Sequence, residues 1–157
     1  VEDFGIYNLV AGFVTLLTVL NNVMTATTQR FINFEIGKKE SGEVNKVFSI
    51  SINIHLVIAA LILILGETIG LWFLNNKLNI PSERMYAANI VYQISLLTTV
   101  INLLRIPYNS IVIAYEKMSF YAILGIIEVI GKLLIVLVLV YFIYDKLIVY
   151  AILLFIL

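Results

Sequence analysis

The sequence lacks cysteine, and among its 157 residues it has a single histidine, His55. The absence of cysteine excludes disulfides and thiolate metal sites, and one histidine argues against a metal held by imidazoles. We therefore expect no metal site and no cofactor. The formal net charge is zero, so the chain has no basic footprint for nucleic acid.

Charged residues are also scarce, at 13% of the chain, whereas a soluble domain has about a quarter. Hydrophobic residues make up 62%, and the mean hydropathy is +1.05. One core cannot hide so much apolar surface, which predicts a polytopic membrane protein. The acidic start at Glu2 and Asp3 is unlike a signal peptide. The first residue is not methionine, and the last apolar run is shorter than the roughly 20 residues of a spanning helix, so we expect an internal fragment of a larger membrane protein.

Apolar runs separated by short polar connections predict an all-α, polytopic transmembrane helical bundle. The predicted spans cover residues 4–28, 47–74, 85–114 and 120–144, and a fifth segment over 147–157 is incomplete. Glu116–Lys117 is predicted to form a tight hairpin. We expect a single domain over 1–157, with four complete spans, part of a fifth and no soluble domain. Lys and Arg are more numerous on the side of the connection that holds Lys38 and Lys39, which favours the cytoplasm for that side.

The first predicted span carries a polar stripe roughly 100° wide, at about 100° per residue. Its members are Asn8, Ala11, Thr15, Thr18, Asn22, Thr25 and Gln29. The opposite side is apolar and suits lipid tails. A helix of this kind faces neighbouring helices or a water-filled cavity. Arg30 ends the stripe, and it either snorkels to lipid headgroups or helps to capture a substrate.

Three charged residues, Arg105, Glu128 and Lys132, lie well inside the predicted spans. An ionisable group at that depth costs at least a few kcal/mol, so it needs a partner or water. Glu128 and Lys132 are four residues apart on one helical face, which predicts an ion pair. Gly125 lies on the same face and permits a close helix approach. Arg105 shares one polar flank of its own span with Ser95, Thr98, Thr99 and Asn102.

The predicted hairpin places two of these charges at nearly the same depth. Arg105 lies twelve residues before Lys117 and Glu128 eleven after it, and both helices rise about 1.5 Å per residue. One interpretation is an Arg105–Glu128 bridge that only fixes the hairpin. The other is that Glu128 is shared with Lys132, which leaves one surplus positive charge to attract an anionic group such as pyrophosphate. Pro107 is expected to kink the helix just beyond Arg105.

The remaining polar residues carry weaker indications. Individually, Asn22, Gln29 and Asn102 suit hydrogen bonding between helices, and His55 suits either hydrogen-bonded packing or proton transfer. No glycine spacing matches a phosphate loop and no catalytic cluster is evident, so we expect no enzymatic activity. The candidate substrate-binding residues are Arg105, Lys132, Glu128, Arg30, Asn22, Gln29 and Asn102.

Three stretches of the sequence resemble one family of membrane proteins. They are VEDFGIYNLV at the start, TATTQRF with EIGK closing the first segment, and RIPYNSIVIAYEKMSFYA across the third and fourth spans. In these stretches the chain resembles the Wzx-type flippases of bacterial polysaccharide biosynthesis, in the multidrug/oligosaccharidyl-lipid/polysaccharide exporter superfamily. The resemblance implies a parent of about 12 to 14 transmembrane helices in two lobes around a central cavity. This chain would hold helices two to five and the start of the sixth, in the amino-terminal lobe.

The resemblance also implies a function. It is the transport of an undecaprenyl-pyrophosphate-linked oligosaccharide across the bacterial inner membrane by alternating access, for polysaccharide, lipopolysaccharide or O-antigen biosynthesis. The implied partners are the lipid bilayer, this lipid-linked glycan and other polysaccharide-assembly membrane proteins. Three rival interpretations stay open: a drug or cation antiporter of the same superfamily, a membrane-embedded sugar or acyl transferase, and a scaffold without transport activity.

Overall fold

The computed structural model describes residues 21–38, 42–78, 80–141 and 146–157, and every element in these ranges is a helix. The first helix covers residues 21–37. It is followed by α2 (Gly42–Leu65), the π-helical turn η1 (Gly66–Gly70), α3 (Leu71–Lys77), the 3₁₀ turn η2 (Ser82–Arg84), α4 (Met85–Ala114), α5 (Met118–Tyr141) and α6 (Lys146–Ile156). The all-α class is thus confirmed for the described part of the chain.

Three continuous helical stretches are long and apolar enough to cross a membrane. They are Glu43–Lys77, Ser82–Ala114 and Met118–Val140, and they correspond to the second, third and fourth predicted spans. Most of the first predicted span lies outside the described residues, so the count of four complete spans stays a prediction. The shorter apolar helix α6 occupies the position of the predicted fifth segment.

The helices on either side of the first connection extend beyond the predicted apolar spans. The first helix continues to residue 37, past the apolar boundary at Thr28, and α2 begins at Gly42. Charged residues such as Arg30 and Glu35 end an apolar run without ending a helix, because their helix propensity is good. The first helix ends at Gly37, a residue type that commonly closes helices.

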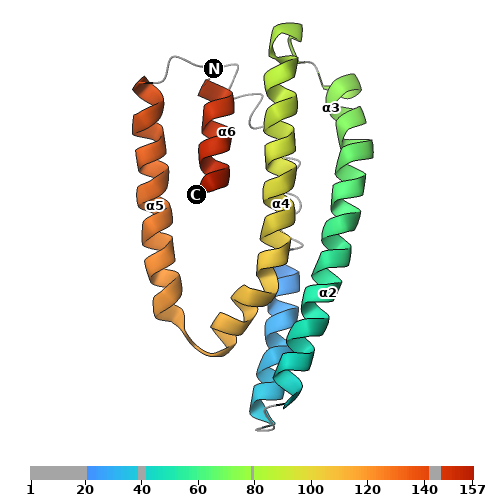
Figure 1. Ribbon diagram of the computed structural model, residues 1–157, viewed down its shortest axis with the longest axis vertical. Helices are drawn as coiled ribbons and strands as arrows, with labels where there is room; N and C mark the ends of the chain where they lie inside the picture. The colour runs from blue at the N-terminus through green and yellow to red at the C-terminus, as the bar shows by residue number, and fades with distance from the viewer. Residues whose placement is uncertain (1–20, 39–41, 79, 142–145) are drawn as a thin grey trace.

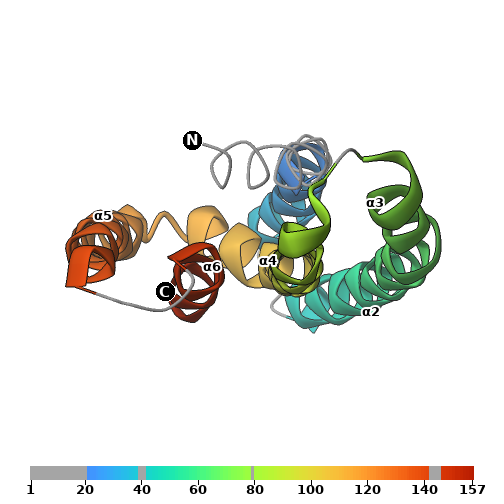
Figure 2. The same cartoon turned by 90° about the horizontal axis from the view of Figure 1, so that it is seen from above.

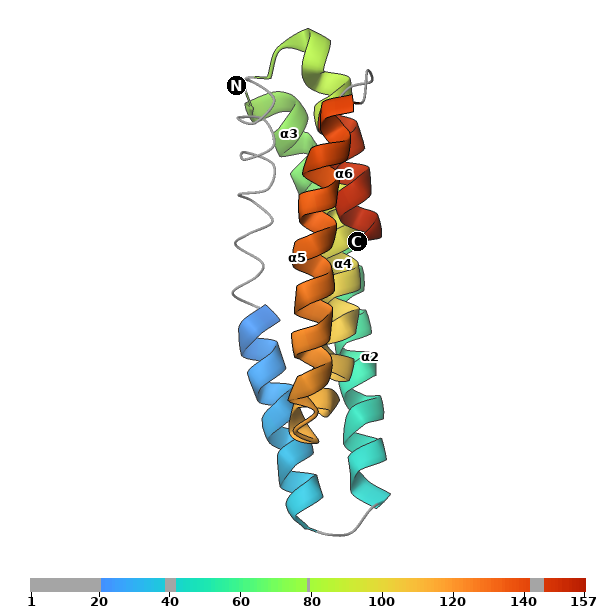
Figure 3. The ribbon, with the colours of Figure 1, turned by 90° about the vertical axis from the view of Figure 1, so that its left-hand side faces the viewer.

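The helices form a row with α4 near its middle. Figures 1 and 2 show α5, α6, α4 and the α2–α3 rod in that order, and the helix over 21–37 lies next to the lower parts of α2 and α4 (Figures 1 and 3). The most apolar part of Ser82–Ala114 is 39% buried, whereas the most apolar part of Met118–Val140 is 6% buried. The third span is therefore the best packed, whereas α5 presents most of its surface outward.

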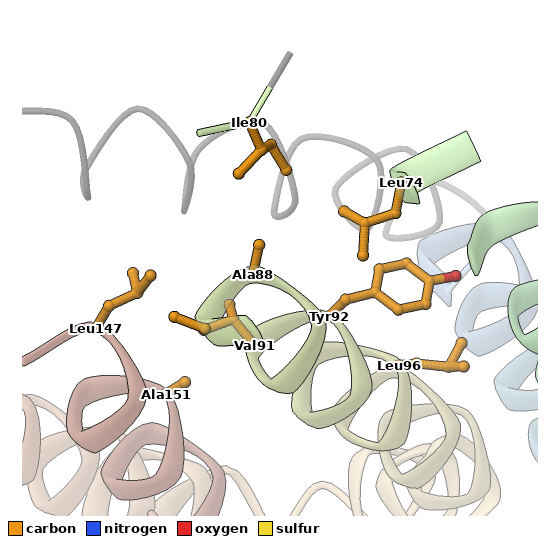
Figure 4. Packing of buried hydrophobic residues seen from close by; sticks show 9 residues of the cluster. Leu74, Ile80, Ala88, Val91, Tyr92, Leu96, Leu147 and Ala151 are labelled. Carbon is orange, nitrogen blue, oxygen red and sulfur yellow. The ribbon is translucent and has the colours of Figure 1, made fainter. Parts of the chain in front are cut away.

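Two hydrophobic clusters hold α4 in place. In the larger cluster, Val91 and Tyr92 of α4 lie between Leu74 of α3 on one side and Leu147 and Ala151 of α6 on the other (Figure 4). The smaller cluster joins the middle of α2 to the second half of α4. Its fully packed members are Ala59, Leu103 and Ile106. Together the clusters fix α4 against α2, α3 and α6, and so they set the position of the polar residues that α4 carries.

The turn η1 supplies a close contact between α2 and α4. A Cβ atom at Gly66 would collide with the side chain of Leu96, and one at Gly70 would collide with Tyr92. Two glycines four residues apart form the small-residue pattern that lets transmembrane helices approach closely. The α4 helix continues through Pro107, and its last turns bend away from the axis of the upper part (Figure 1), as the proline predicts.

Candidate functional site

The candidate site lies on the hairpin that joins α4 to α5. Backbone N–H groups of Glu116 and Lys117 donate hydrogen bonds of 2.9 and 3.1 Å to Ile113 and Val112 in the last turn of α4. Glu116 has a φ of 56°, in the left-handed region. This conformation reverses the chain, so α5 runs antiparallel to α4 (Figure 1). The predicted turn at Glu116–Lys117 is confirmed, whereas α4 and α5 diverge beyond it and α6 lies between them (Figures 1 and 2).

One ion pair of the site lies within α5. Lys132 Nζ is 2.6 Å from Glu128 Oε1, and the two side chains are 55% and 54% exposed. The spacing of four residues places the two groups on adjacent turns of one helical face, as the sequence predicts. The pair is open to the surroundings, so its carboxylate neutralises the ammonium without burying it.

Arg105 contributes a second positive charge. It is exposed on α4 and forms no ion pair with another described residue. It lies within electrostatic range of both Glu128 and Tyr121 of α5, which places the three side chains near one another. Because the partner of Glu128 is Lys132, the purely structural Arg105–Glu128 bridge does not form. Two cations and one carboxylate leave the group with one surplus positive charge.

Tyr121 adds a hydrogen-bonding group that the sequence did not single out as functional. Its hydroxyl is buried and has no hydrogen-bond partner among the described residues. Tyr121 lies seven residues before Glu128, which is two helical turns. Helical spacing therefore places Tyr121 on the same face as Glu128 and Lys132, and this spacing could have identified it from the sequence. A free hydroxyl within the field of Arg105 is a neutral donor suited to an anion.

The polar flank of α4 divides into an inner and an outer part. The hydroxyls of Thr98 and Thr99 donate to the carbonyls of Ile94 and Ser95, at 2.7 and 2.9 Å, and so they are satisfied within the helix. Thr99 is buried. Asn102, in contrast, is exposed one turn before Arg105. Of the predicted flank, therefore, Asn102 and Arg105 are the residues that face outward and can meet a ligand.

The polar stripe of the first helix is described only in part. Asn22 and Arg30 are exposed and Gln29 is half-buried, and none of the three forms a hydrogen bond or ion pair with another described residue. The predicted stripe members Asn8, Ala11, Thr15 and Thr18 lie outside the described residues. No hydrogen bond or ion pair joins Asn22, Gln29 or Arg30 to the charges of the α4–α5 hairpin within the described ranges. The structure thus assembles Arg105, Glu128, Lys132 and Tyr121, but not the whole predicted set.

The glycine that makes the close helix contact on α5 differs from the predicted one. A Cβ at Gly125 would meet nothing within 4 Å, so no described residue makes the close approach that this glycine permits. A Cβ at Gly131 would instead collide with Leu157 of the chain end beyond α6. The α6 helix packs along the Gly131 side of α5, and the face with Gly125, Glu128 and Lys132 stays open.

Comparisons with known proteins add no assignment. The chain matches no protein-family model, no curated protein and no solved structure. Within the described residues, no group of three or more His, Asp or Glu side chains is arranged to hold a metal ion. The chemistry of the site therefore follows from its own residues, which are two cations, one carboxylate, one phenol and one amide.

Proposed function

We propose that this chain is part of a transporter that moves an oligosaccharide linked to undecaprenyl pyrophosphate across the bacterial inner membrane by alternating access. In this proposal the chain contributes four spans and the start of a fifth to the amino-terminal lobe of a larger, two-lobed protein. The observation that carries the proposal is the surplus positive charge on the open face of the α4–α5 hairpin.

The depth of these charges supports a ligand-binding role. Arg105, Glu128 and Lys132 all lie within helices long and apolar enough to cross a membrane, and all three side chains are exposed. Exposed charges at that depth are costly against lipid tails, so they face water or a further part of the protein. A pyrophosphate head group offers several anionic oxygens, which match the donors of an arginine, a lysine and a tyrosine hydroxyl.

The polar amides support the handling of a sugar. Asn22, Gln29 and Asn102 present donors and acceptors that have no partner among the described residues. Sugar hydroxyls that leave water need such partners, because an unpaired polar group is costly in an apolar environment. In the proposed arrangement the polyprenyl tail stays in lipid, beside the outward-facing apolar surface of α5.

The direct test is transport of the lipid-linked oligosaccharide by the full-length protein in vesicles. Arg105→Ala and Lys132→Ala are each expected to lower transport by about tenfold or more, which corresponds to the loss of a charge-assisted hydrogen bond of about 1.5–3 kcal/mol. Lys117→Ala is the matched control, since it removes the same charge at the hairpin tip, and it should transport like the wild type.

Two results of that assay would contradict the proposal. Wild-type transport in both Arg105→Ala and Lys132→Ala would show that these two cations do not bind the substrate. Transport of a cationic drug that is unaffected by these substitutions, with no movement of the lipid-linked glycan, would instead favour the antiporter interpretation.

A further inference from the structure

A second group of polar side chains lies at the junction of α2 with the helix over 21–37. Its members, Thr28, Ser51 and His55, are all buried, and His55 is 2% exposed. Ser51 Oγ donates to Thr28 Oγ1 at 3.4 Å, which links the two helices. His55 Nδ1 lies 2.7 Å from the carbonyl oxygen of Ser51. This group has no part in the anion site of the α4–α5 hairpin.

The hydrogen bonds of His55 fix which ring nitrogen carries its first proton. A carbonyl oxygen only accepts, so the hydrogen bond to Ser51 requires the proton on Nδ1. The other ring nitrogen, Nε2, is buried and has no hydrogen-bond partner among the described residues. A proton on Nε2 as well would give a buried cation without an acceptor, which is strongly unfavourable. In the packed arrangement, the neutral imidazole therefore has its proton on Nδ1 and a bare lone pair on Nε2.

Within the described ranges, the neighbouring helices offer no charge next to His55 that would stabilise a cation there. On the helix over 21–37, the buried ionisable residue is Glu35, two turns beyond Thr28, and its Oε1 is held by Lys38 at 2.9 Å. On α4, the buried residues toward this junction, Leu103, Ile106 and Ser110, carry no charge, and Ser110 Oγ donates to the carbonyl oxygen of Thr25 at 3.3 Å. On α2 itself, the flanking charged residues are Lys46 and Glu67, at least nine residues from His55.

We propose that Nε2 of His55 is a proton-binding site, and that its protonation separates the helix over 21–37 from α2. The neutral ring fits the packed junction, whereas the protonated ring needs water or an acceptor that only a separated junction can admit. Protons therefore bind the separated state better and shift the population toward it. Histidine changes charge in the range of physiological pH, which makes such a switch usable in a cell. The proposal does not depend on what the protein transports.

Nuclear magnetic resonance of the full-length protein with a ¹⁵N-labelled imidazole at His55 tests the first half of this proposal. This chain has a single histidine, which simplifies the assignment of its ring signals. At about pH 8 the expected form carries its proton on Nδ1, and acidification to about pH 5 should protonate Nε2 in one transition. A proton on Nε2 at about pH 8, or a ring that does not titrate, would overturn the proposal.

Distances between spin labels test the second half. Phe31 and Ile50 are exposed on the two helices, and the chain has no cysteine of its own, so Phe31→Cys and Ile50→Cys give one labelled pair. Lowering the pH from about 8 to about 5 should raise the population of a longer distance by about tenfold or more, with the midpoint of the imidazole titration.

Two variants separate His55 from other titrating groups. His55→Phe should lose the pH-dependent distance, because its ring fills a similar space without binding a proton. Glu35→Gln is the matched control at the other buried ionisable residue of this interface, and it should keep the response. A pH-dependent separation that persists in His55→Phe, or a wild-type imidazole that titrates without any separation, would overturn the proposal.

Discussion

The hydroxyl of Tyr92 donates a hydrogen bond of 2.9 Å to the carbonyl oxygen of Gly66, at the π-helical turn between α2 and α3. The ring of Tyr92 lies against Gly70, one turn farther along. A π-helical turn leaves carbonyl groups less regularly paired than an α-helix does. Tyr92 thus satisfies one such carbonyl and fills the space that the glycines leave, which fastens α4 to the long second span.

Substitutions at Tyr92 and Gly70 should destabilise the protein singly but compensate in part when combined. Tyr92→Phe loses the hydrogen bond to Gly66, at about 1 kcal/mol, and Gly70→Ala forces a methyl group against the tyrosine hydroxyl, at about 1–3 kcal/mol. The double variant lacks the hydroxyl that the new methyl group meets. Thermal unfolding in detergent should therefore show a loss smaller than the sum of the two, and strict additivity would contradict this packing.

Replacing Glu128 should strengthen anion binding with little effect on stability. Glu128→Gln changes the site from one surplus positive charge to two, so the affinity of the full-length protein for inorganic pyrophosphate should rise by about three- to tenfold. The ion pair with Lys132 is half-exposed, so its loss should cost no more than about 0.5 kcal/mol. Calorimetric titration measures the affinity, with Glu67→Gln near the other end of the bundle as the control. Unchanged or weaker binding of pyrophosphate to Glu128→Gln would show that Glu128 does not lie at the anion-binding site.

The two glycines of α5 should respond differently to the same substitution. Gly131→Ala places a methyl group against Leu157 and should loosen the contact between α5 and the end of the chain. Gly125→Ala meets open space, and it should be neutral or should stabilise the helix by up to about 1 kcal/mol. Unfolding of the two variants in detergent checks this, and a greater loss of stability in Gly125→Ala would place a neighbouring helix on the Glu128 face.

Much of the helix arrangement could be predicted from the sequence, because it depends on local signals. The predicted third span, 85–114, has the bounds of α4, since Glu116–Lys117 and the polar segment before Met85 interrupt the apolar pattern sharply. The Glu128–Lys132 pair was also predictable, because residues four apart on a helix meet whatever the tertiary structure is.

The features that escaped prediction depend on contacts between distant segments. Arg105 and Glu128 lie near one another, but the carboxylate of Glu128 pairs with Lys132. Helix spacing alone does not decide between Arg105 and Lys132 as its partner. Which glycine of α5 lies in a close contact depends on where α6 packs. The π-helical turn has no local marker such as proline, and it shows itself only in the fit between Gly70 and Tyr92.

The most direct test of the proposed water-lined face is the accessibility of single cysteines in the full-length protein to a membrane-impermeant thiol reagent. Asn22→Cys, Asn102→Cys and Arg105→Cys replace exposed polar residues, whereas Leu97→Cys and Ile101→Cys replace exposed apolar residues of the same α4 helix. If the polar face borders an aqueous path, the three polar positions should react at least about tenfold faster than the two apolar positions, because the thiolate forms in water and not among lipid tails. Equal and slow labelling at all five positions, in every conformation of the full-length protein, would contradict a water-lined face.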